Sequence, residues 1–400
     1  MIKSSKITIK YSNTNKIVNL NEFITEYKNV VKNFIDLIWD EEDIKPLMDE
    51  SYTKQINSWL SQRAIQSAGK QASGIVRGTK AKQKKMLRVI DKLNKEGQFK
   101  KARKLKLKYL EKKVTKPDIN IVQPELDSRF VKIELNNDTS FDGWITLASL
   151  GNKLNIKIPI RKHKHFNKML EEGVLKKGVR ISNDKITFMF EQPEPIQQTQ
   201  GQTLGIDIGQ KTTLSCSNGQ TIEADCHGHN YQSICKRLSN KKKGSKSFEK
   251  TQNHRSNYIK WCVNQIDFSN IKQVNLENIK NLRRNKKTSR SLGHWNYAEL
   301  FDKLESKLID YGVHVNKVNP TYTSQRCSEC GWVCKSNRKL KKFKCGKCGY
   351  TADSDLNASM NLSFDLIPLG DQKHLSKANR SGFYWYLVDQ ERIVPDALQA

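Results

Sequence analysis

Three acidic residues stand where carboxylates could hold divalent metal ions. Asp207 lies in Leu-Gly-Ile-Asp-Ile-Gly, Glu277 in Val-Asn-Leu-Glu-Asn-Ile and Asp355 in Asp-Ser-Asp-Leu-Asn-Ala. The first two lie at the ends of predicted strands and the third begins a predicted helix. Three such carboxylates can hold two metal ions, and a pair of metal ions hydrolyses phosphodiesters. The trio therefore predicts a catalytic site for two Mg²⁺ ions at Asp207, Glu277 and Asp355.

The third position of this trio has an alternative. Asp355 directly precedes the Leu-Asn-Ala start of the helix, and Asp353 stands two residues earlier. An acid here also serves as a helix cap and interacts favourably with the helix dipole, so capping is the structural interpretation of Asp355. We take Asp355 as the third acid and keep Asp353 as the residue that could replace it.

Four cysteines form a zinc-binding pattern. Cys327-x-x-Cys330 and Cys345-x-x-Cys348 are each followed by glycine, and 14 residues separate the two pairs. Four thiolates in two such knuckles suit tetrahedral zinc and leave no coordination position open, so we expect one structural Zn²⁺ per chain. Cys334, a fifth cysteine nearby, is interpreted as a spare thiol.

The remaining cysteines lack this spacing. Cys226 stands beside His227 and His229, which makes these three residues an alternative second metal site. Cysteines paired in knuckles, and not spread as a disulfide framework, favour a reducing compartment, so we expect a cytoplasmic protein. The other three cysteines are expected to pack in the interior: Cys216, Cys235 and Cys262.

The charge of the chain indicates a polyanionic partner. Its 71 Lys and Arg against 41 Asp and Glu give a net charge of +30. Residues 70–116 alone carry 18 basic side chains against three acidic ones, and such density repels itself unless a polyanion is bound. No apolar run reaches membrane-spanning length, so we expect nucleic acid and no membrane partner. The candidate phosphate contacts are Arg77, Lys80, Lys82, Lys84, Lys85 and Arg88.

The first half of the chain predicts helices followed by strands. Helical spacing predicts one helix from a cap at Asn21 to Ile38, a second from Tyr52 to about Ala68, and a basic helical hairpin that turns at Gly97. Alternation then predicts strands that close a small β-barrel together with an early strand at residues 6–11. The later strands are expected at residues 130–136, 141–148, 154–160 and 179–191, the last split by a turn at 182–184.

The second half predicts a sheet that would assemble the acids. After a linker at residues 192–202, three antiparallel strands are followed by a helix, a strand, a helix and a strand. This is the order of an RNase H-like fold, in which the first and fourth strands are adjacent, so Asp207 and Glu277 would come together. The strands are expected at 203–208, 212–217, 220–224, 273–276 and 313–318, and the helices at about 233–266 and 297–311.

These motifs resemble the split RuvC nuclease of the TnpB family, which the miniature type V CRISPR effectors share. The resemblance rests on Gly205-Ile-Asp207-Ile-Gly209, Leu276-Glu277-Asn-Ile279, the Thr323–Gly331 knuckle and Asp353-Ser-Asp355-Leu-Asn357-Ala358. It implies that Asp207, Glu277 and Asp355 are the catalytic acids. It further implies a guide RNA and target DNA as partners in a prokaryotic cell, with activity at the nucleoid, and we expect a monomer.

The resemblance implies an α+β multidomain protein. Its parts would be a wedge β-barrel with an inserted helical recognition lobe, and an RNase H-like (RuvC) nuclease domain with a zinc-ribbon insert that binds target nucleic acid. The role of the C-terminal tail is open: its Phe383–Tyr386 cluster could pack, pair with another chain or contact RNA. The expected boundaries are 1–15 and 126–196 (wedge), 16–125 (lobe), 203–322 and 353–365 (nuclease), 323–352 (insert) and 366–400 (tail).

The function that follows is that of a transposon-associated RNA-guided DNA endonuclease with two-metal hydrolysis. Two alternatives share its architecture: a miniature type V CRISPR effector with the same chemistry, and an RNA-guided DNA-binding repressor that lacks one or more acids. A third alternative is a zinc-containing DNA-binding protein without a guide. All three acids are present, which favours a nuclease.

Overall fold

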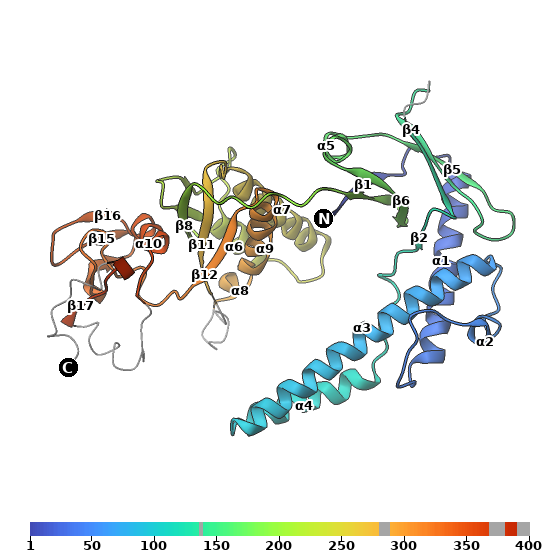
Figure 1. Ribbon diagram of the computed structural model, residues 1–400, viewed down its shortest axis with the longest axis horizontal. Coiled ribbons are helices and arrows are strands. Elements are labelled where there is room, and N and C mark those ends of the chain that lie inside the picture. The colour runs from blue at the N-terminus through green and yellow to red at the C-terminus, as the bar shows by residue number, and fades with distance from the viewer. Residues whose placement is uncertain (136–138, 280–288, 368–380, 390–400) are drawn as a thin grey trace. The chain divides into compact units, whose positions relative to one another are not determined.

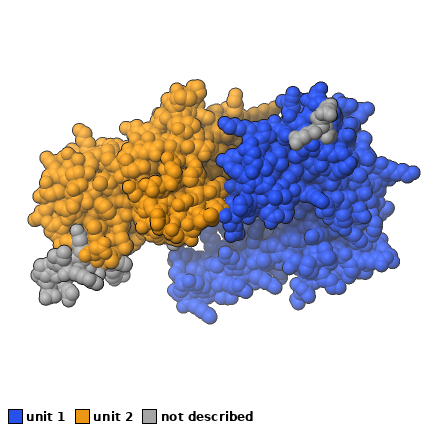
Figure 2. Space-filling model, turned by 45° about the horizontal axis from the view of Figure 1, so that its top comes forward, with its two compact units in different colours: residues 1–194 blue, residues 195–400 orange. Residues whose placement is uncertain are grey.

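The chain is a mixed α/β protein with two compact units, residues 1–194 and 195–400 (Figure 1, Figure 2). The division falls inside the predicted linker 192–202. None of the described helices is long and apolar enough to cross a membrane. The computed structural model describes residues 1–135, 139–279, 289–367 and 381–389.

Helix α1 of the first unit spans Thr14–Ile38 and is longer than predicted. It begins after Asn13, so the predicted cap at Asn21 is wrong. Asn21 lies inside the helix, where its carbonyl accepts a hydrogen bond of 2.8 Å from Thr25 Oγ1. The predicted apolar stripe is confirmed as a fully buried face, because Phe23, Tyr27, Val30, Val31, Phe34 and Ile38 are all inaccessible to solvent.

The basic segment belongs to one long helix. The predicted helix from Tyr52 to Ala68 is wrong: α2 covers only Glu50–Thr53, and α3 runs without a break over Gln62–Lys95. Ser61 sets the start of α3, since its side chain accepts the N–H of Ala64 at 3.1 Å.

The predicted helical hairpin at Gly97 is confirmed. Gly97 has φ +69°, the left-handed conformation that glycine adopts without strain and that commonly ends a helix. The chain then returns as α4 (Phe99–Val114) beside α3 (Figure 1). Only one residue of α4, Ala102, is buried, so the rest of this helix is available to solvent or a ligand.

The strands of the first unit form two sheets. The early strand is confirmed as a member, since β1 pairs antiparallel with β7 from Ile2↔Glu191 to Thr8↔Lys185. The described strands do not close a barrel, so the predicted closed barrel is wrong. One sheet has the order β1-β7-β6-β2 and the other β3-β4-β5. The strands are β1 Ile2–Thr8, β2 Glu125–Leu126, β3 Val131–Leu135, β4 Gly143–Leu147, β5 Ile156–Ile160, β6 Val174–Ile181 and β7 Lys185–Glu191.

One hydrophobic core joins both sheets to the helices. Phe188 and Phe190 of β7 pack on Phe166 with ring centroids 5.3 and 5.2 Å apart. Phe166 belongs to α5 (Lys164–Glu172), a helix that the sequence analysis missed. The predicted turn at 182–184 is confirmed between β6 and β7, while Asn136, the predicted end of a strand, lies outside the described residues.

The second unit is built on a five-stranded sheet of order β10-β9-β8-β11-β12. β8 and β10 each pair antiparallel with β9, and β11 runs parallel to both β8 and β12. The predicted adjacency of the first and fourth strands is therefore confirmed. The strands are β8 Gln202–Ile208, β9 Leu214–Cys216, β10 Thr221–Ile222, β11 Ile271–Glu277 and β12 His314–Val318.

The predicted helix at 233–266 is wrong as one element, because the chain breaks after Ser239. Gly244 has φ +83°, and Ser245 caps a new helix by accepting the N–H of Phe248 at 3.2 Å. Cys216, Cys235 and Cys262 are buried in the core of this unit, as predicted. The helices are α6 Tyr231–Ser239, α7 Lys246–Asn264, α8 Arg290–Gly293, α9 Tyr297–Asp310 and α10 Ser354–Ser363.

The cysteine-rich insert forms small strands that the described part of the tail covers. The backbone N–H of Trp385 donates a hydrogen bond of 2.9 Å to the carbonyl of Gly331. The carbonyl of Trp385 accepts a hydrogen bond of 2.8 Å from Arg326 Nε. The aromatic cluster at 383–386 thus packs within the chain, while residues 368–380 and 390–400 of the tail lie outside the described residues. The strands are β13 Trp332–Val333, β14 Arg338–Lys339, β15 Lys342–Lys344, β16 Thr351–Asp353 and β17 Phe383–Tyr384, with a short 3₁₀ turn at Lys335–Asn337.

Candidate active site and metal centre

Two of the predicted acids lie at the same edge of the sheet. Asp207 is next to last in β8, and Glu277 ends β11. Leu276 pairs with Ile206 in the parallel ladder between these strands. Parallel neighbours end at the same side of a sheet, so the two carboxylates emerge next to one another.

Helix α10 brings Asp355 to this edge. The helix packs on β8 at Gly205, where an added Cβ would lie 2.0 Å from the carbonyl oxygen of Ser359. Any side chain at position 205 would separate helix and strand, so glycine is required there. Asp355 stands in the first turn of the helix and is only 6% exposed.

Asp353 occupies the capping position of α10. Its Oδ1 accepts the N–H groups of Asp355 at 2.8 Å and of Leu356 at 3.3 Å. Capping is thus the work of Asp353, and the carboxylate of Asp355 is free of it.

We expect Asp353→Ala to lower the free energy of unfolding by about 1 kcal/mol, because the first turn of α10 loses its acceptor. On the nuclease hypothesis from the sequence, cleavage by the remaining folded protein should continue. Asp353→Asn, which retains an oxygen acceptor, is the matched control and should unfold near the wild-type denaturant midpoint. A complete loss of cleavage in both variants would instead make Asp353 the third acid.

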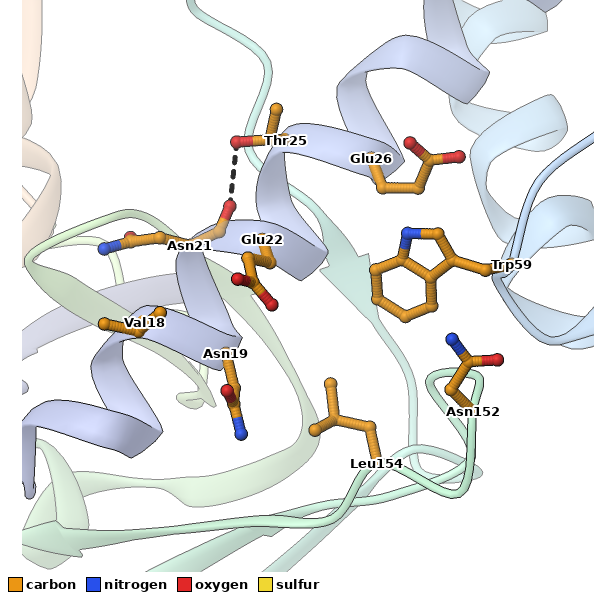
Figure 3. Close-up of a pocket in the computed structure, with 9 residues that line it drawn as sticks. All are labelled: Val18, Asn19, Asn21, Glu22, Thr25, Glu26, Trp59, Asn152 and Leu154. Atoms are coloured by element: carbon orange, nitrogen blue, oxygen red, sulfur yellow. Dashed lines mark hydrogen bonds between the residues drawn. The ribbon is translucent and has the colours of Figure 1, made fainter.

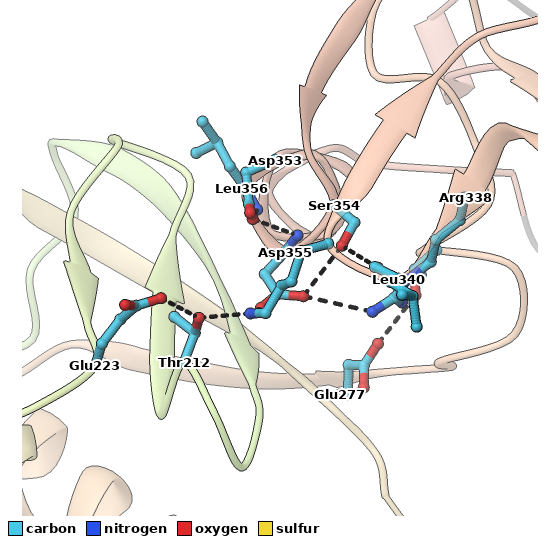
Figure 4. A network of polar contacts seen from close by, with 11 residues as sticks. Thr212, Glu223, Glu277, Arg338, Leu340, Asp353, Ser354, Asp355 and Leu356 are labelled. Atoms are coloured by element: carbon cyan, nitrogen blue, oxygen red, sulfur yellow. Dashed lines mark hydrogen bonds and ion pairs between the residues drawn. The ribbon is translucent and has the colours of Figure 1, made fainter. Parts of the chain in front are cut away.

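Two cations of the insert lie against Asp355. Arg338 Nη2 is 3.4 Å from Asp355 Oδ1 (Figure 4). Lys341 Nζ forms an ion pair with Oδ2 of the same carboxylate. Lys341 also donates to Thr212 Oγ1 at 2.5 Å, and Thr212 donates to Glu223 at 2.8 Å. Sequence reasoning missed both cations. Their position between the two cysteine knuckles is the one feature that could have suggested them.

The environment raises the pKa of both Asp207 and Glu277 in the absence of metal. Burial, and then the charges of Glu277 and Asp355, raises the pKa of Asp207 to about 7, against the opposing charge of Arg338. Burial also raises the pKa of Glu277, although a hydrogen bond of 3.0 Å from Thr323 Oγ1 and the charge of Arg338 act in the opposite direction. Further positive charge near these two carboxylates would lower their pKa values and favour the ionised forms.

This raised pKa predicts a pH-dependent stability. An acid whose pKa rises on folding stabilises the fold fully below its unfolded pKa of about 3.9 and loses that contribution as pH rises through its folded value. Stability without magnesium should therefore fall between about pH 4, where Asp207 ionises in the unfolded chain, and about pH 7, where it ionises in the folded protein. The unfolding temperature of Asp207→Asn should exceed that of the wild type by more at pH 8 than at pH 5. An equal difference at both pH values would contradict this prediction.

The three acids are spread over a wider area than a single-ion site. Among the described residues they do not form a cluster of ligand atoms that all lie within 4.8 Å of one another. In a two-metal site the ions lie about 3.5–4 Å apart. Its outermost ligands are therefore farther from one another than the ligands of a single ion. Carboxylate oxygens are suitable ligands for hard cations of this kind.

The four knuckle cysteines come together as a compact cluster. Cys327 and Cys348 place their Sγ atoms 3.7 Å apart, and Cys330 and Cys345 place theirs 3.6 Å apart. Zn–S bonds of about 2.3 Å in a tetrahedron separate the sulfurs by about 3.8 Å, so the cluster fits zinc. Gly331 and Gly349 have φ +77° and +79°, a conformation in which a side chain would be strained.

The folded chain confirms the interpretation of Cys334 as a thiol outside the zinc site and changes the partners of the suggested second metal site. Cys334 lies outside the cluster and contacts Ser336 Oγ at 3.1 Å. The suggested second metal site of Cys226, His227 and His229 is wrong in its partners. Among the described residues, the second group of metal-ligand atoms within 4.8 Å of one another comprises Asp225, His229 and His254.

The candidate phosphate contacts follow one another along α3. Lys80 is partly buried, because its ammonium group donates to the carbonyl of Glu41. Lys84, Lys85 and Arg88 line a shallow hollow together with Val89. The exposed members of the predicted set are Arg77, Lys82, Lys84, Lys85 and Arg88.

A different hollow of about 700 Å³ lies beside α1 in the first unit (Figure 3). The indole of Trp59 forms one wall, with the amide of Asn152 and the carboxylate of Glu26 near it (Figure 3). An aromatic face with amide and carboxylate groups suits planar, hydrogen-bonding molecules, whereas the two acids Glu22 and Glu26 disfavour phosphate. The hollow thus differs in chemistry from the basic helix pair.

Comparison with known proteins finds one family model and several relatives that match parts of this chain. Residues 297–362 match the family model of the Cas12f1-like TNB domain. The CRISPR-associated endodeoxyribonuclease Cas12f1 of Sulfoacidibacillus thermotolerans is 38% identical over 122 residues, which cover 30% of this chain and 28% of that protein. The putative RNA-guided DNA endonuclease InsQ of Escherichia coli is 37% identical over 84 residues, 21% of each chain.

Other relatives and structures extend the comparison. The TnpB-like protein MJ0751 of Methanocaldococcus jannaschii is 30% identical over 145 residues, 33% of this chain and 51% of that protein. A Cas12f1–sgRNA–target DNA complex superposes with a TM-score of 0.48 and 17% identity over 91% of this chain and 98% of that one. The matched segments span 24% to 37% of the lengths of three Cas12f1 relatives. The family model and these relatives agree with the resemblance to the TnpB family and the miniature type V effectors that the motifs implied.

Proposed function

We propose that the protein is an RNA-guided DNA endonuclease of the TnpB type that cuts by phosphodiester hydrolysis in a RuvC site of RNase H-like fold. One observation carries the proposal: β8 and β11 are parallel neighbours, with Asp207 and Glu277 at the same edge of the sheet. The antiparallel β8–β10 followed by the parallel β11 and β12 is the arrangement that an RNase H-like fold requires.

Asp207, Glu277 and Asp355 would hold two Mg²⁺ ions. When bound, such ions supply an activated water molecule and charge stabilisation for the leaving oxygen. The chain itself holds the carboxylates in position. Thr323 orients Glu277 through its hydroxyl, and packing of α10 on β8 fixes the place of Asp355.

Arg338 and Lys341 would act as counter-ions to the acids before metal enters. Their charges face Asp355 in the structure, and a buried carboxylate without a partner charge is costly. Because both residues lie between the knuckles, the zinc-bearing insert contributes directly to the electrostatics of the nuclease site. We therefore assign the insert, residues 323–352, a role in the cleavage reaction as well as in binding target strands.

The basic surface of α3 and α4 would bind the guide RNA through its phosphates. Contacts of this kind give affinity and position but carry no base sequence, which guide–target pairing would supply. On this proposal residues 16–125 form the recognition lobe, and residues 1–15 and 126–196 form the wedge. The nuclease domain then comprises residues 203–322 and 353–365.

Expression of the protein together with the DNA of its native locus, followed by purification, tests the proposal. The protein should co-purify with an RNA and should cut, with Mg²⁺, duplex DNA that matches this RNA. Protein that carries no RNA and leaves matched DNA uncut would favour a DNA-binding role. The similarity to Cas12f1 proteins favours a CRISPR effector as the second candidate. An RNA transcribed from a repeat–spacer array would support that candidate, and one from a transposon end the TnpB role.

A further inference from the structure

The second unit contains a group of nitrogen and oxygen ligands apart from the three acids and the four cysteines. Asp225 and His229 lie in the loop between β10 and α6, and His254 lies on α7. Each offers a ligand atom, and these atoms lie within 4.8 Å of one another. The two imidazole rings meet edge to face, with centroids 4.8 Å apart.

The loop presents its two ligands in a fixed arrangement. Asp225 Oδ1 accepts the N–H groups of His227 and His229, each at 2.9 Å, which leaves Oδ2 directed to other partners. Gly228 allows the tight return of the chain with φ +73°. Nδ1 of His229 is buried 3.4 Å from Asp225 Oδ2, yet it has no well-aligned hydrogen-bond partner among the described residues. A buried ring nitrogen without such a partner is uncommon and suggests a missing ligand.

Arg237 occupies the lone pair that a metal ion would need. Arg237 Nη2 lies 2.9 Å from Nδ1 of His254. A guanidinium group can only donate hydrogen bonds, so Nδ1 is the acceptor. A neutral imidazole has one unprotonated nitrogen, so a metal ion and Arg237 compete for the same ring. Arg237 is exposed on the last turn of α6 and is able to move into solvent.

We propose that Asp225, His229 and His254 form a binding site for a divalent first-row transition metal of the Zn²⁺ class. Two imidazoles and one carboxylate favour Zn²⁺ or Co²⁺ over Mg²⁺, which prefers an all-oxygen set. The bound ion displaces the guanidinium of Arg237 from His254. The site is independent of the proposed nuclease function, because none of its ligands belongs to the acid trio.

Metal at this site would tie the loop to α7 close to the wall of the acid site. Tyr258, one turn after His254, donates to the carbonyl of Glu223 at 2.8 Å. The carboxylate of Glu223 accepts the hydroxyl of Thr212, which in turn contacts Lys341. Binding would thus brace Glu223 and Thr212, the second of which contacts Lys341, one of the two cations beside Asp355.

Titration of the full chain with Co²⁺, its knuckles loaded with zinc, tests the site. We expect one Co²⁺ per chain to bind with visible d–d absorption and without the intense thiolate charge-transfer band of a cysteine site. His229→Ala and His254→Ala should each weaken this binding by about tenfold or more. Arg237→Ala should strengthen it several-fold, because the competing cation is gone.

His227→Ala is the matched control, since its ring lies beside His229 but outside the ligand group. It should bind Co²⁺ like the wild type. Thermal unfolding without Co²⁺ checks that each variant is folded, and His229, on a loop outside the hydrophobic core, is the variant least exposed to that problem. A wild-type chain that binds no Co²⁺, or a His229→Ala chain with unchanged affinity, overturns the proposal.

Discussion

Asp207→Ala is expected to reduce Mg²⁺-dependent cleavage of guide-matched DNA by at least about a thousandfold. Asp207 stands beside Glu277 at the edge shared by β8 and β11, and alanine removes a ligand that the neighbouring acids cannot replace. Binding of matched duplex DNA should remain near wild type, because it depends on base pairing and on backbone contacts elsewhere. Rates of cutting and gel-shift affinities, measured on the same preparation, separate the two effects.

Asp267→Ala provides the control for this experiment. Asp267 is an exposed acid in the loop before β11, where it accepts hydrogen bonds from Ser269. The substitution is the same and lies in the same unit, so cleavage should continue at the wild-type rate. Wild-type cleavage by Asp207→Ala itself would sink the active-site assignment.

Loss of the knuckle zinc is expected to unfold the insert and to abolish cleavage together with it. The buried apolar cluster of the insert consists of only Cys327, Phe343 and Cys345, which is too small to hold a fold without metal. Structural zinc contributes about 10–16 kcal/mol in small zinc-binding peptides. Cys345→Ser should therefore lose the tightly held ion, and residues 323–352 should become accessible to protease.

Cys334→Ser is the matched control within the same insert, because this thiol lies outside the cluster. It should retain one tightly bound zinc in metal analysis and resist protease like the wild type. Cleavage should be lost in Cys345→Ser, since Arg338 and Lys341 no longer reach Asp355. A Cys345→Ser protein with full zinc content would contradict the knuckle assignment.

The sheet of the second unit was predictable because local signals and topology agree. Asn218-Gly219 predicts the turn between β9 and β10, and Gly219 indeed has φ +89°. The order of strands and helices then placed β8 beside β11. The acid edge followed from these two facts, without knowledge of any side-chain contact.

Other features depend on contacts between distant segments and could not be read from the sequence. Lys341 reaches Asp355 because β15 and β16 pair, and His254 reaches Asp225 because α7 packs beside α6. Helix α5 has only Phe166 and Met169 buried, a pattern too short to show helical periodicity. The barrel was overpredicted, since alternation identifies strands but does not decide which edges pair.

The packing of α10 on β8 also decides when the acid site first exists during synthesis. Asp207 leaves the ribosome about 150 residues before Asp355, which at about 5–20 residues per second is a delay of about 8–30 s. Arg338 and Lys341 are made just before Asp355, so the counter-charges precede the last acid. A nascent chain that has already folded its sheet thus carries two of the three acids. The acid site is complete only when α10 has been synthesised.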